Sequence, residues 1–497
     1  MQIEEIEVTP LKAQKFRRQS TYQEVVDSIP VGRFHYLLLL TCGLCYMAVS
    51  VEIIGMSVIT FSANCDLNFT LYQKGIVLTT SYLGSILSMY VMGFLADTKG
   101  RVNTLKKTVA LSILSSFLSV FSVNAWMLIA LRFFTGFFIS ACQSCVFTLL
   151  GEYHGKDSRM KHLTILAGFL PFGIIYIYAV GVVVSLIDVE SYIPILSSWR
   201  LILLGYILPS VLARIGLAFI PESPKFVLAK GGVSQCVGTF RKISVMNNGK
   251  AFNPELITID EDSNIFKNVD GVLETVKHMW DQSLSLFHSD RILETVKLSF
   301  VGFTLSMCGA GVSLWIPTIA RNIIASTKEH TLCNMVRLTQ NTTNICPFDN
   351  EKGVDLYLFL TAIFAIMFLI FIATSVHINI MGRKIALVTW LSFGGLASCT
   401  LYFSTVYLIN VTALIFVVQA ANLIGVVAGV ATEYYPTNIN AMGVCFVMLA
   451  SRLGVVAGGN LVGPLLLTYC NSMFLVFALL FTAVMLLSLK LPYRSSK

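Results

Sequence analysis

Charged residues are scarce in this chain. They make up 12% of its 497 residues, whereas soluble domains carry about 25%. Hydrophobic residues make up 55%, and the mean hydropathy is +0.75. This composition excludes an ordinary soluble domain and predicts a polytopic membrane protein whose surface faces mostly lipid.

The motifs of enzymes and ATP-driven pumps are also missing. The sequence has no phosphate-binding Gly-x-x-x-x-Gly-Lys loop, no Gly-x-Gly-x-x-Gly and no nucleophile–base arrangement. Two Cys-x-x-Cys pairs, at Cys42 and Cys45 and at Cys142 and Cys145, lie in apolar runs without nearby histidines. A zinc site needs four converging ligands. We therefore expect no enzyme, no metal site and no cofactor, and interpret these cysteines as packing residues.

The net charge of +8 does not indicate a nucleic-acid partner. Its lysines and arginines sit in short clusters between apolar runs, and no nucleic-acid-binding motif is present. Alternate loops carry the clusters, and cytosolic loops of membrane proteins are enriched in basic residues. This pattern predicts a multi-pass protein with both termini in the cytosol. The plasma membrane and an intracellular vesicle membrane both fit.

About twelve apolar runs are long enough to cross a bilayer. We expect an all-α fold of twelve transmembrane helices in two pseudo-symmetric six-helix halves. The predicted divisions are a cytosolic tail over 1–33, the first half over 34–220, a cytosolic linker over 221–296, the second half over 297–491 with an outer loop at 321–354, and a cytosolic tail over 492–497. Within the linker, the apolar spacing of 272–280 predicts an interfacial helix.

A tight, charged turn joins the second and third runs. Residues 93–101 read Gly-Phe-Leu-Ala-Asp-Thr-Lys-Gly-Arg. We expect Gly93 to let two helices approach closely and Gly100 to let the chain reverse. This turn resembles the Gly-x-x-x-Asp-x-x-Gly-Arg loop between the second and third helices of the major facilitator superfamily. A weaker copy at 378–384 contains Arg383.

Other short stretches narrow the resemblance. Residues 132–136, 151–159, 221–226 and 433–437 are similar to elements of the sugar-porter and organic-ion-transporter branches. More narrowly, 65–67, 93–101, 152–159 and 315–317 resemble the synaptic vesicle glycoprotein 2 family. The resemblance implies a monomeric secondary active or facilitative transporter that moves a small organic solute by alternating access, with proton co-transport left open. A non-transporting binding or regulatory protein of the synaptic vesicle glycoprotein 2 type remains the alternative.

The resemblance also implies a cytosolic gate. We expect its charged members to form a latch that closes in the outward-open state; the alternative is that these charges only anchor loops at the lipid surface. The candidate gate residues are Gly93, Asp97, Gly100, Arg101, Arg132, Glu152, Arg159, Glu222, Arg383 and Glu433.

Two ionisable residues lie inside predicted spans. Glu52 is in the first helix, where an acid costs about 2.5–3.5 kcal/mol to insert and usually faces a cavity. It suggests proton coupling or recognition of a cation, against the alternative of a structural hydrogen bond. Arg452 is in the eleventh helix, where the resemblance to organic-anion transporters implies contact with an anion. The two residues indicate opposite substrate charges or a pair, so the charge of the solute stays open.

A small-molecule cavity also needs a few polar groups among apolar walls. Taken individually, each candidate is better explained as a packing residue than as a ligand-binding residue. They are Gln143, Tyr176, Tyr178, Trp315, Gln419 and Asn422.

The predicted outer loop carries features of an oxidising compartment. It contains Cys333, Cys346 and the sequon that begins at Asn341; a second sequon on the same side begins at Asn68. We expect glycosylation at Asn341 and Asn68. A disulfide between Cys333 and Cys346 is the hypothesis for the cysteines, and two free thiols are the alternative.

Overall fold

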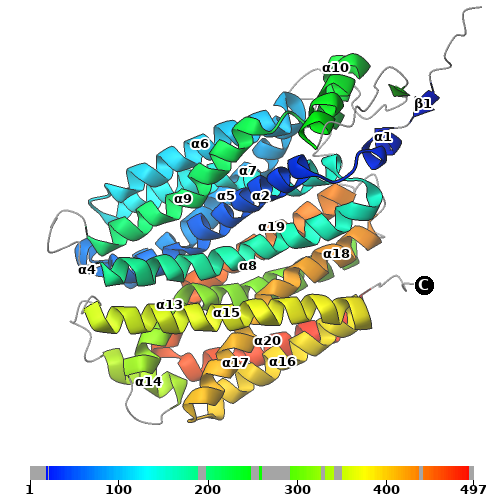
Figure 1. The fold of residues 1–497 in the computed structure, drawn as a ribbon. Coiled ribbons are helices and arrows are strands. Elements are labelled where there is room, and N and C mark those ends of the chain that lie inside the picture. Colours follow the sequence, from blue (N-terminus) through cyan, green and yellow to red (C-terminus); the bar gives the residue numbers. More distant parts are fainter. Residues whose placement is uncertain are drawn as a thin grey trace, which may run out of the picture.

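The computed structural model describes residues 18–20, 22–187, 197–247, 257–259, 292–325, 331–340, 350–435 and 440–491. Long helices in two groups dominate these ranges (Figure 1). The first group consists of α2 (Arg33–Ile54) with its continuation α3 (Met56–Ser62), α5 (Leu71–Lys99), α6 (Arg101–Val120), α7 (Ala125–Tyr153), α8 (Lys156–Leu186) and α9 (Ser198–Phe219).

The second group consists of α12 (Ile292–Leu305) with η3 (Ser306–Ala310) and α13 (Gly311–Ala325), α15 (Asn350–Met381), α16 (Arg383–Phe403), α17 (Tyr407–Gln419) with η4 (Ala420–Leu423) and α18 (Ile424–Tyr434), α19 (Asn440–Thr468) and α20 (Cys470–Leu489). The shorter elements are β1 (Arg18–Ser20), α1 (Tyr22–Ser28), α4 (Asn64–Leu67), α10 (Pro224–Met246), β2 (Ile257–Ile259) and α14 (Leu332–Gln340). β1 and β2 pair in parallel.

Ten helices of the described ranges are long and apolar enough to cross a membrane. The α5 helix, bent by 48°, is an eleventh when its two segments are counted as one span. The α6 helix has 20 residues, but Arg101, Lys106 and Lys107 lie in its first two turns and four serines follow. The α6 helix is therefore too polar to count among the helices that could cross a membrane by composition. Hydropathy supports ten or eleven of the twelve expected spans.

The charged turn and its weaker copy adopt the same backbone conformation. Gly100 ends α5 with φ +94° and Gly382 ends α15 with φ +83°, values that favour glycine. At Gly100 an added methyl group would also lie 2.5 Å from Glu222 Oε2. The expected close approach at Gly93 is wrong, because an added methyl group there would meet nothing within 4 Å. α5 and α7 instead meet at Gly136, whose added methyl would lie 2.1 Å from Ser81 O.

The two groups meet along two seams, α5 against α19 and α8 against α15 (Figure 1). We call the end of the bundle that carries the turn at 93–101 the loop end, and the other the opposite end. α1, α10 and the C-terminal end of α20 all lie at the loop end (Figure 1). The N-terminal and C-terminal parts of the chain therefore lie at one end of the bundle.

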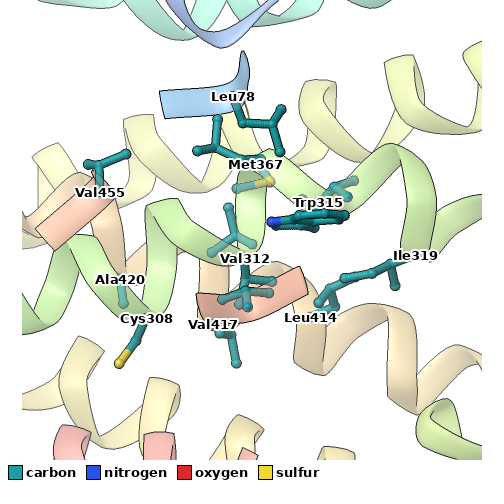
Figure 2. Packing of buried hydrophobic residues seen from close by; sticks show 14 of the residues in the cluster. Leu78, Cys308, Val312, Trp315, Ile319, Met367, Leu414, Val417, Ala420 and Val455 are labelled. Carbon is teal, nitrogen blue, oxygen red and sulfur yellow. The ribbon is translucent and has the colours of Figure 1, made fainter. Parts of the chain in front are cut away.

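The apolar core consists of two clusters, and one of them contains residues of both groups. One cluster includes residues of both groups, among them Leu78 of α5, Trp315 of α13 and Val455 of α19 (Figure 2). A second cluster, at the loop end, draws its buried residues from α1 to α10 alone, for example Val26, Leu149 and Ile243. Burial of apolar surface therefore holds the halves together toward the opposite end.

The start of the predicted linker is folded against the first half. Its α10 helix packs on α2 and α7. The next residue, Asn247, accepts a hydrogen bond from the Phe34 backbone N–H at 2.9 Å and donates to Pro30 O at 3.1 Å. This segment thereby caps the first turn of α2. The interfacial helix expected at 272–280 lies outside the described residues.

The disulfide hypothesis is wrong. Cys333, in α14, bonds to Cys470 at the start of α20, with the Cα atoms 5.5 Å apart. Cys65 is also disulfide-bonded, and Cys346 lies outside the described residues. Proximity in sequence suggested Cys346, but folding places α14 beside a helix that starts 137 residues further on. The disulfide therefore attaches α14 to the start of α20.

Candidate functional site

Glu52 of α2 and Arg132 of α7 form an ion pair inside the first half. Arg132 Nη1 lies 2.8 Å from Glu52 Oε2, and both side chains are 0% exposed. Ser116 of α6 donates to the same carboxylate oxygen at 2.9 Å and accepts from Arg132 Nη2 at 2.9 Å. Ser119 also accepts from Nη2. The guanidinium of Arg132 is therefore held by Glu52 and the serines of α6, and its place in the gate stays a prediction.

This pair is only partly satisfied. Glu52 Oε1 and Arg132 Nε have no hydrogen-bond partner among the described residues. Removing one charge from a buried pair is costly because the other charge is left uncompensated in low dielectric. Protonation of Glu52 would likewise remove its negative charge and leave the Arg132 charge uncompensated. A single proton could thus change the balance of forces between α2, α6 and α7.

Arg452 of α19 connects the two halves near the middle of the bundle. Its Nη1 donates to Ser85 O of α5 at 3.0 Å, and its Nη2 donates to Gln143 Oε1 of α7. Glu52 and Arg452 therefore do not pair with each other. The structure instead brings two predicted residues, Arg452 and Gln143, into direct contact across the seam.

Two helical segments of the second half are irregular, and the break in one of them lies beside α19. A π-helical turn, η3, interrupts α12 and α13, and a 3₁₀ turn, η4, interrupts α17 and α18. Ser306 of η3 and Ser451, the neighbour of Arg452, share a hydrogen bond of 2.6 Å. Single π-helical turns often occur at functional sites. Sequence reasoning missed both breaks, since neither contains proline.

Gln419 and Asn422 lie together at the η4 turn. Asn422 Nδ2 donates to Gln419 Oε1 at 2.9 Å, while Gln419 Nε2 has no partner among the residues described. Two other candidates are engaged inside one half. Trp315 Nε1 donates to Gly459 O at 2.8 Å and Tyr176 OH donates to Gly205 O at 2.8 Å. Trp315, which is 4% exposed, is a core residue (Figure 2).

The loop end carries a charged network within the first half. Arg101 pairs with Glu152 at the end of α7, and Ser223 Oγ donates to Glu152 Oε2 at 2.5 Å. Glu222 accepts from the backbone N–H groups of Val102 at 2.9 Å and Asn103 at 3.0 Å. An acid there interacts favourably with the helix dipole of α6. The network thus fixes α6, α7 and the start of α10 to one another.

The remaining gate candidates differ in their contacts. Asp97 lies 3.7 Å from Arg101 with its side chain 56% exposed. Arg159 lies against Gly151, where an added methyl would be 2.9 Å from its Nε. Tyr153, which sequence reasoning missed, donates to Pro221 O at 2.8 Å. In the second half, Arg383 Nη1 donates to Gly429 O at 3.1 Å.

The Arg101–Glu152 pair does not itself join the halves. It is present in a structure whose core links the halves toward the opposite end. The expectation that the pair closes only in the outward-open state stays a prediction. The side chain of Glu433 lies outside the described residues.

At the opposite end, Asp66 organises α4, α6 and α9. It accepts from Trp199 Nε1 at 2.8 Å and pairs with Arg200 Nη1 at 3.2 Å. Arg200 Nε in turn donates to Val120 O at 3.1 Å. Partial burial acts to raise the pKa of Asp66, but hydrogen bonds from Ser197 and Trp199 and the charge of Arg200 lower that pKa below its usual value.

The two sequons have different outcomes. Asn68 is exposed in a left-handed conformation with φ 46° at the end of α4, and Thr70 of its sequon caps α5. Glycosylation of Asn68 stays a prediction. Asn341 lies outside the described residues.

Several known proteins resemble the chain in sequence. A sequence model of the Major Facilitator Superfamily matches residues 38–330. Synaptic vesicle glycoprotein 2B of Mus musculus is 26% identical over 324 residues, which are 60% of this chain and 47% of that protein. Synaptic vesicle glycoprotein 2A of Rattus norvegicus is 26% identical over 328 residues, 61% of this chain and 44% of that protein. The chain spans about half the length of these curated relatives.

Solved structures share the fold. The partially occluded inward open xylose transporter XylE from E. coli has a TM-score of 0.66 at 14% identity, covering 92% of this chain and 97% of that one. A D-xylose-proton symporter gives 0.60 at 14% identity, covering 93% and 98%. The nucleoside transporter NupG gives 0.61 at 11% identity, covering 92% and 100%. With the sequence match over more than half of the 497 residues, the chain belongs to the Major Facilitator Superfamily.

Proposed function

We propose that this protein is a secondary transporter that carries a small organic solute across a membrane by alternating access. Glu52 binds the coupled proton. The observation that carries this proposal is the enclosed Glu52–Arg132 pair at 2.8 Å with both side chains 0% exposed. An acid in a membrane span is costly and usually functional. A D-xylose-proton symporter of the same fold supports proton coupling.

The contacts between the halves support alternating access. Asn460 of α19 donates to Thr79 of α5 at 3.0 Å, and Tyr178 of α8 stacks on Phe364 of α15 at 4.7 Å. These contacts lie toward the opposite end, whereas the apolar cluster at the loop end draws its buried residues from the first half alone. The arrangement agrees with one end sealed and the other open. With the loop end in the cytosol, as the basic loops favour, this is an inward-facing state.

The solute site in this proposal is the centre of the seam. Arg452 and Gln143 meet there, the η3 turn lies beside α19, and the η4 turn packs on η3. Such broken helices near the midplane supply binding groups in transporters. A membrane protein that binds or regulates partners without transport is the weaker alternative, because the solved structures that share the fold are xylose and nucleoside transporters.

Purified protein in liposomes tests the proposal. Uptake of a panel of radiolabelled sugars, organic anions and organic cations is measured with and without an imposed pH gradient. We expect at least one solute to accumulate when the gradient is present, and Glu52→Gln to abolish the gradient dependence. Liposomes that take up no solute of any class would favour the non-transporting alternative. Uptake with the same gradient dependence in Glu52→Gln would remove Glu52 from the coupling step.

A further inference from the structure

Buried hydroxyl groups gather between Glu52 and the opposite end. Ser57 of α3 is 3% exposed, Tyr178 of α8 is 0% exposed and Tyr357 of α15 is 1% exposed. None of the three hydroxyls makes a hydrogen bond of good geometry within the described part of the chain. A buried hydroxyl without a partner loses its hydration uncompensated. Several together in one region therefore call for a physical explanation.

The row of hydroxyls begins just beyond Glu52 along the chain, and Glu52 Oε1 has no partner among the described residues. Three residues further on, Gly55 breaks the helix, and Tyr206 of α9 packs there: a methyl added at Gly55 would lie 2.6 Å from Tyr206 Cε2. The ring of Tyr206 therefore lies beside the break between α2 and α3. Tyr206 itself donates to Ile177 O at 3.3 Å. Among described residues, Arg132 is the charged group that contacts Glu52.

The row continues along α3 to the seam between the halves. Tyr178 lies beside Ser57, and Tyr357 lies beside both Tyr178 and Ser62, the last residue of α3. Tyr357 comes from the second half and packs on α8, because a methyl added at Gly181 would lie 2.7 Å from its Cδ1. Separation of α8 from α15 would therefore expose these hydroxyls to water.

We propose that Ser57, Tyr178 and Tyr357 line the route by which protons reach Glu52 from the opposite end. The proposal rests on the proposed function, in which Glu52 binds the coupled proton. A hydroxyl can donate and accept at once. Each hydroxyl therefore accepts a proton from a neighbouring water and donates its own proton to the next group. It is a neutral hydroxyl again after the transfer. The last transfer forms an O–H bond on the Glu52 carboxylate.

Infrared spectroscopy of the full protein in liposomes tests this route. The carboxylic-acid C=O stretch that disappears in Glu52→Gln reports protonation of Glu52. Its rate of appearance after an acid jump is compared between wild type and Tyr178→Phe, which removes the unpartnered hydroxyl and keeps the ring. Tyr176→Phe is the matched control on the same helix, because that hydroxyl already donates to Gly205 O at 2.8 Å.

We expect protonation to slow by about tenfold or more in Tyr178→Phe, equivalent to about 1.4 kcal/mol in the barrier. Tyr176→Phe should keep the wild-type rate, and Ser57→Ala and Tyr357→Phe should repeat the slowing if Tyr178→Phe fails to fold. Equal rates in wild type and the three row variants would overturn the route while leaving Glu52 as the proton site. A spectrum without any Glu52-dependent band across the pH range would overturn both the route and proton coupling.

Discussion

The enclosed Glu52–Arg132 pair makes a quantitative prediction about stability. Glu52→Gln, Arg132→Gln and the double variant form a thermodynamic cycle. Both side chains are 0% exposed and the contact is 2.8 Å. Removing one partner leaves an unpaired buried charge, which costs about 3–5 kcal/mol. The double variant leaves no charge, so it should be more stable than either single variant. We therefore expect a coupling energy of about 3 kcal/mol.

Thermal unfolding in detergent measures this cycle. A thiol-reactive fluorescent dye suits the chain because six of its free cysteines are buried and become reactive only on unfolding. The matched control is the cycle of Asp66→Asn and Arg200→Gln. That pair has side chains 39% and 19% exposed, and exposed pairs contribute about 0.2–1 kcal/mol.

Additive effects of the two single variants would refute the reasoning. In that case the neighbouring serines would satisfy each charge independently, and Glu52 could change protonation without disturbing Arg132. A coupling energy no larger than that of the Asp66–Arg200 cycle would have the same meaning. Either result would remove the physical basis for coupling between protonation and movement of α2.

Three further predictions concern other parts of the molecule. Mass spectrometry of unreduced peptides should recover Cys333 linked to Cys470, and Cys333 linked to any other cysteine would contradict the structure. Gly136→Ala should lower the free energy of unfolding by about 1–3 kcal/mol because its methyl would overlap α5. Gly93→Ala, the control, should have the melting temperature of wild type. Equal melting temperatures for the two variants would contradict the glycine contacts. Burial lowers the pKa of His154 from 6.5 to about 4, so the folded state binds fewer protons and stability should fall as pH drops from 6.5 toward 4. His154→Gln should weaken this dependence in thermal melts, and an unchanged dependence would exclude His154.

The architecture was predictable from the sequence because the lipid bilayer restricts which structures can cross it. A bilayer requires long apolar helices, and basic residues concentrate in particular loops. The turn at 93–101 was recognisable because Gly100 needs a positive φ and Arg101 follows it at fixed spacing. α6 was the least certain span because Ser116 and Ser119, which hold Arg132, also lower its hydropathy.

The pairings within the site were not predictable. Glu52 and Arg132 lie 80 residues apart, and no local pattern favours Arg132 over Arg452 as the partner of Glu52. The disulfide failed for the same reason, since chain distance is a poor guide once helices pack. Gly93 shows a different limit: a glycine can occupy a helix without any neighbour that requires it.

Arg452 provides a prediction about the conformational equilibrium. It donates to Ser85 O at 3.0 Å and to Gln143 Oε1, and both acceptors belong to the other half. A hydrogen bond to a charged group contributes about 1.5–3 kcal/mol. Arg452→Gln should therefore weaken the sealed opposite end and raise the population of the state in which that end is open by about tenfold or more.

Labelling from the opposite side measures this change. Leu78 lies in the sealed core and is 2% exposed, so a Leu78→Cys reporter reacts with a membrane-impermeant maleimide only when the seam opens. Peptide mass spectrometry separates it from the native thiols, and Cys142, which is 0% exposed in the first half, serves as the internal control for unfolding. Faster labelling of the reporter in Arg452→Gln, with Cys142 unlabelled, is the expected result. An unchanged labelling rate would mean that apolar packing between α5 and α19 seals the seam without Arg452, and that its guanidinium is free to serve the solute alone.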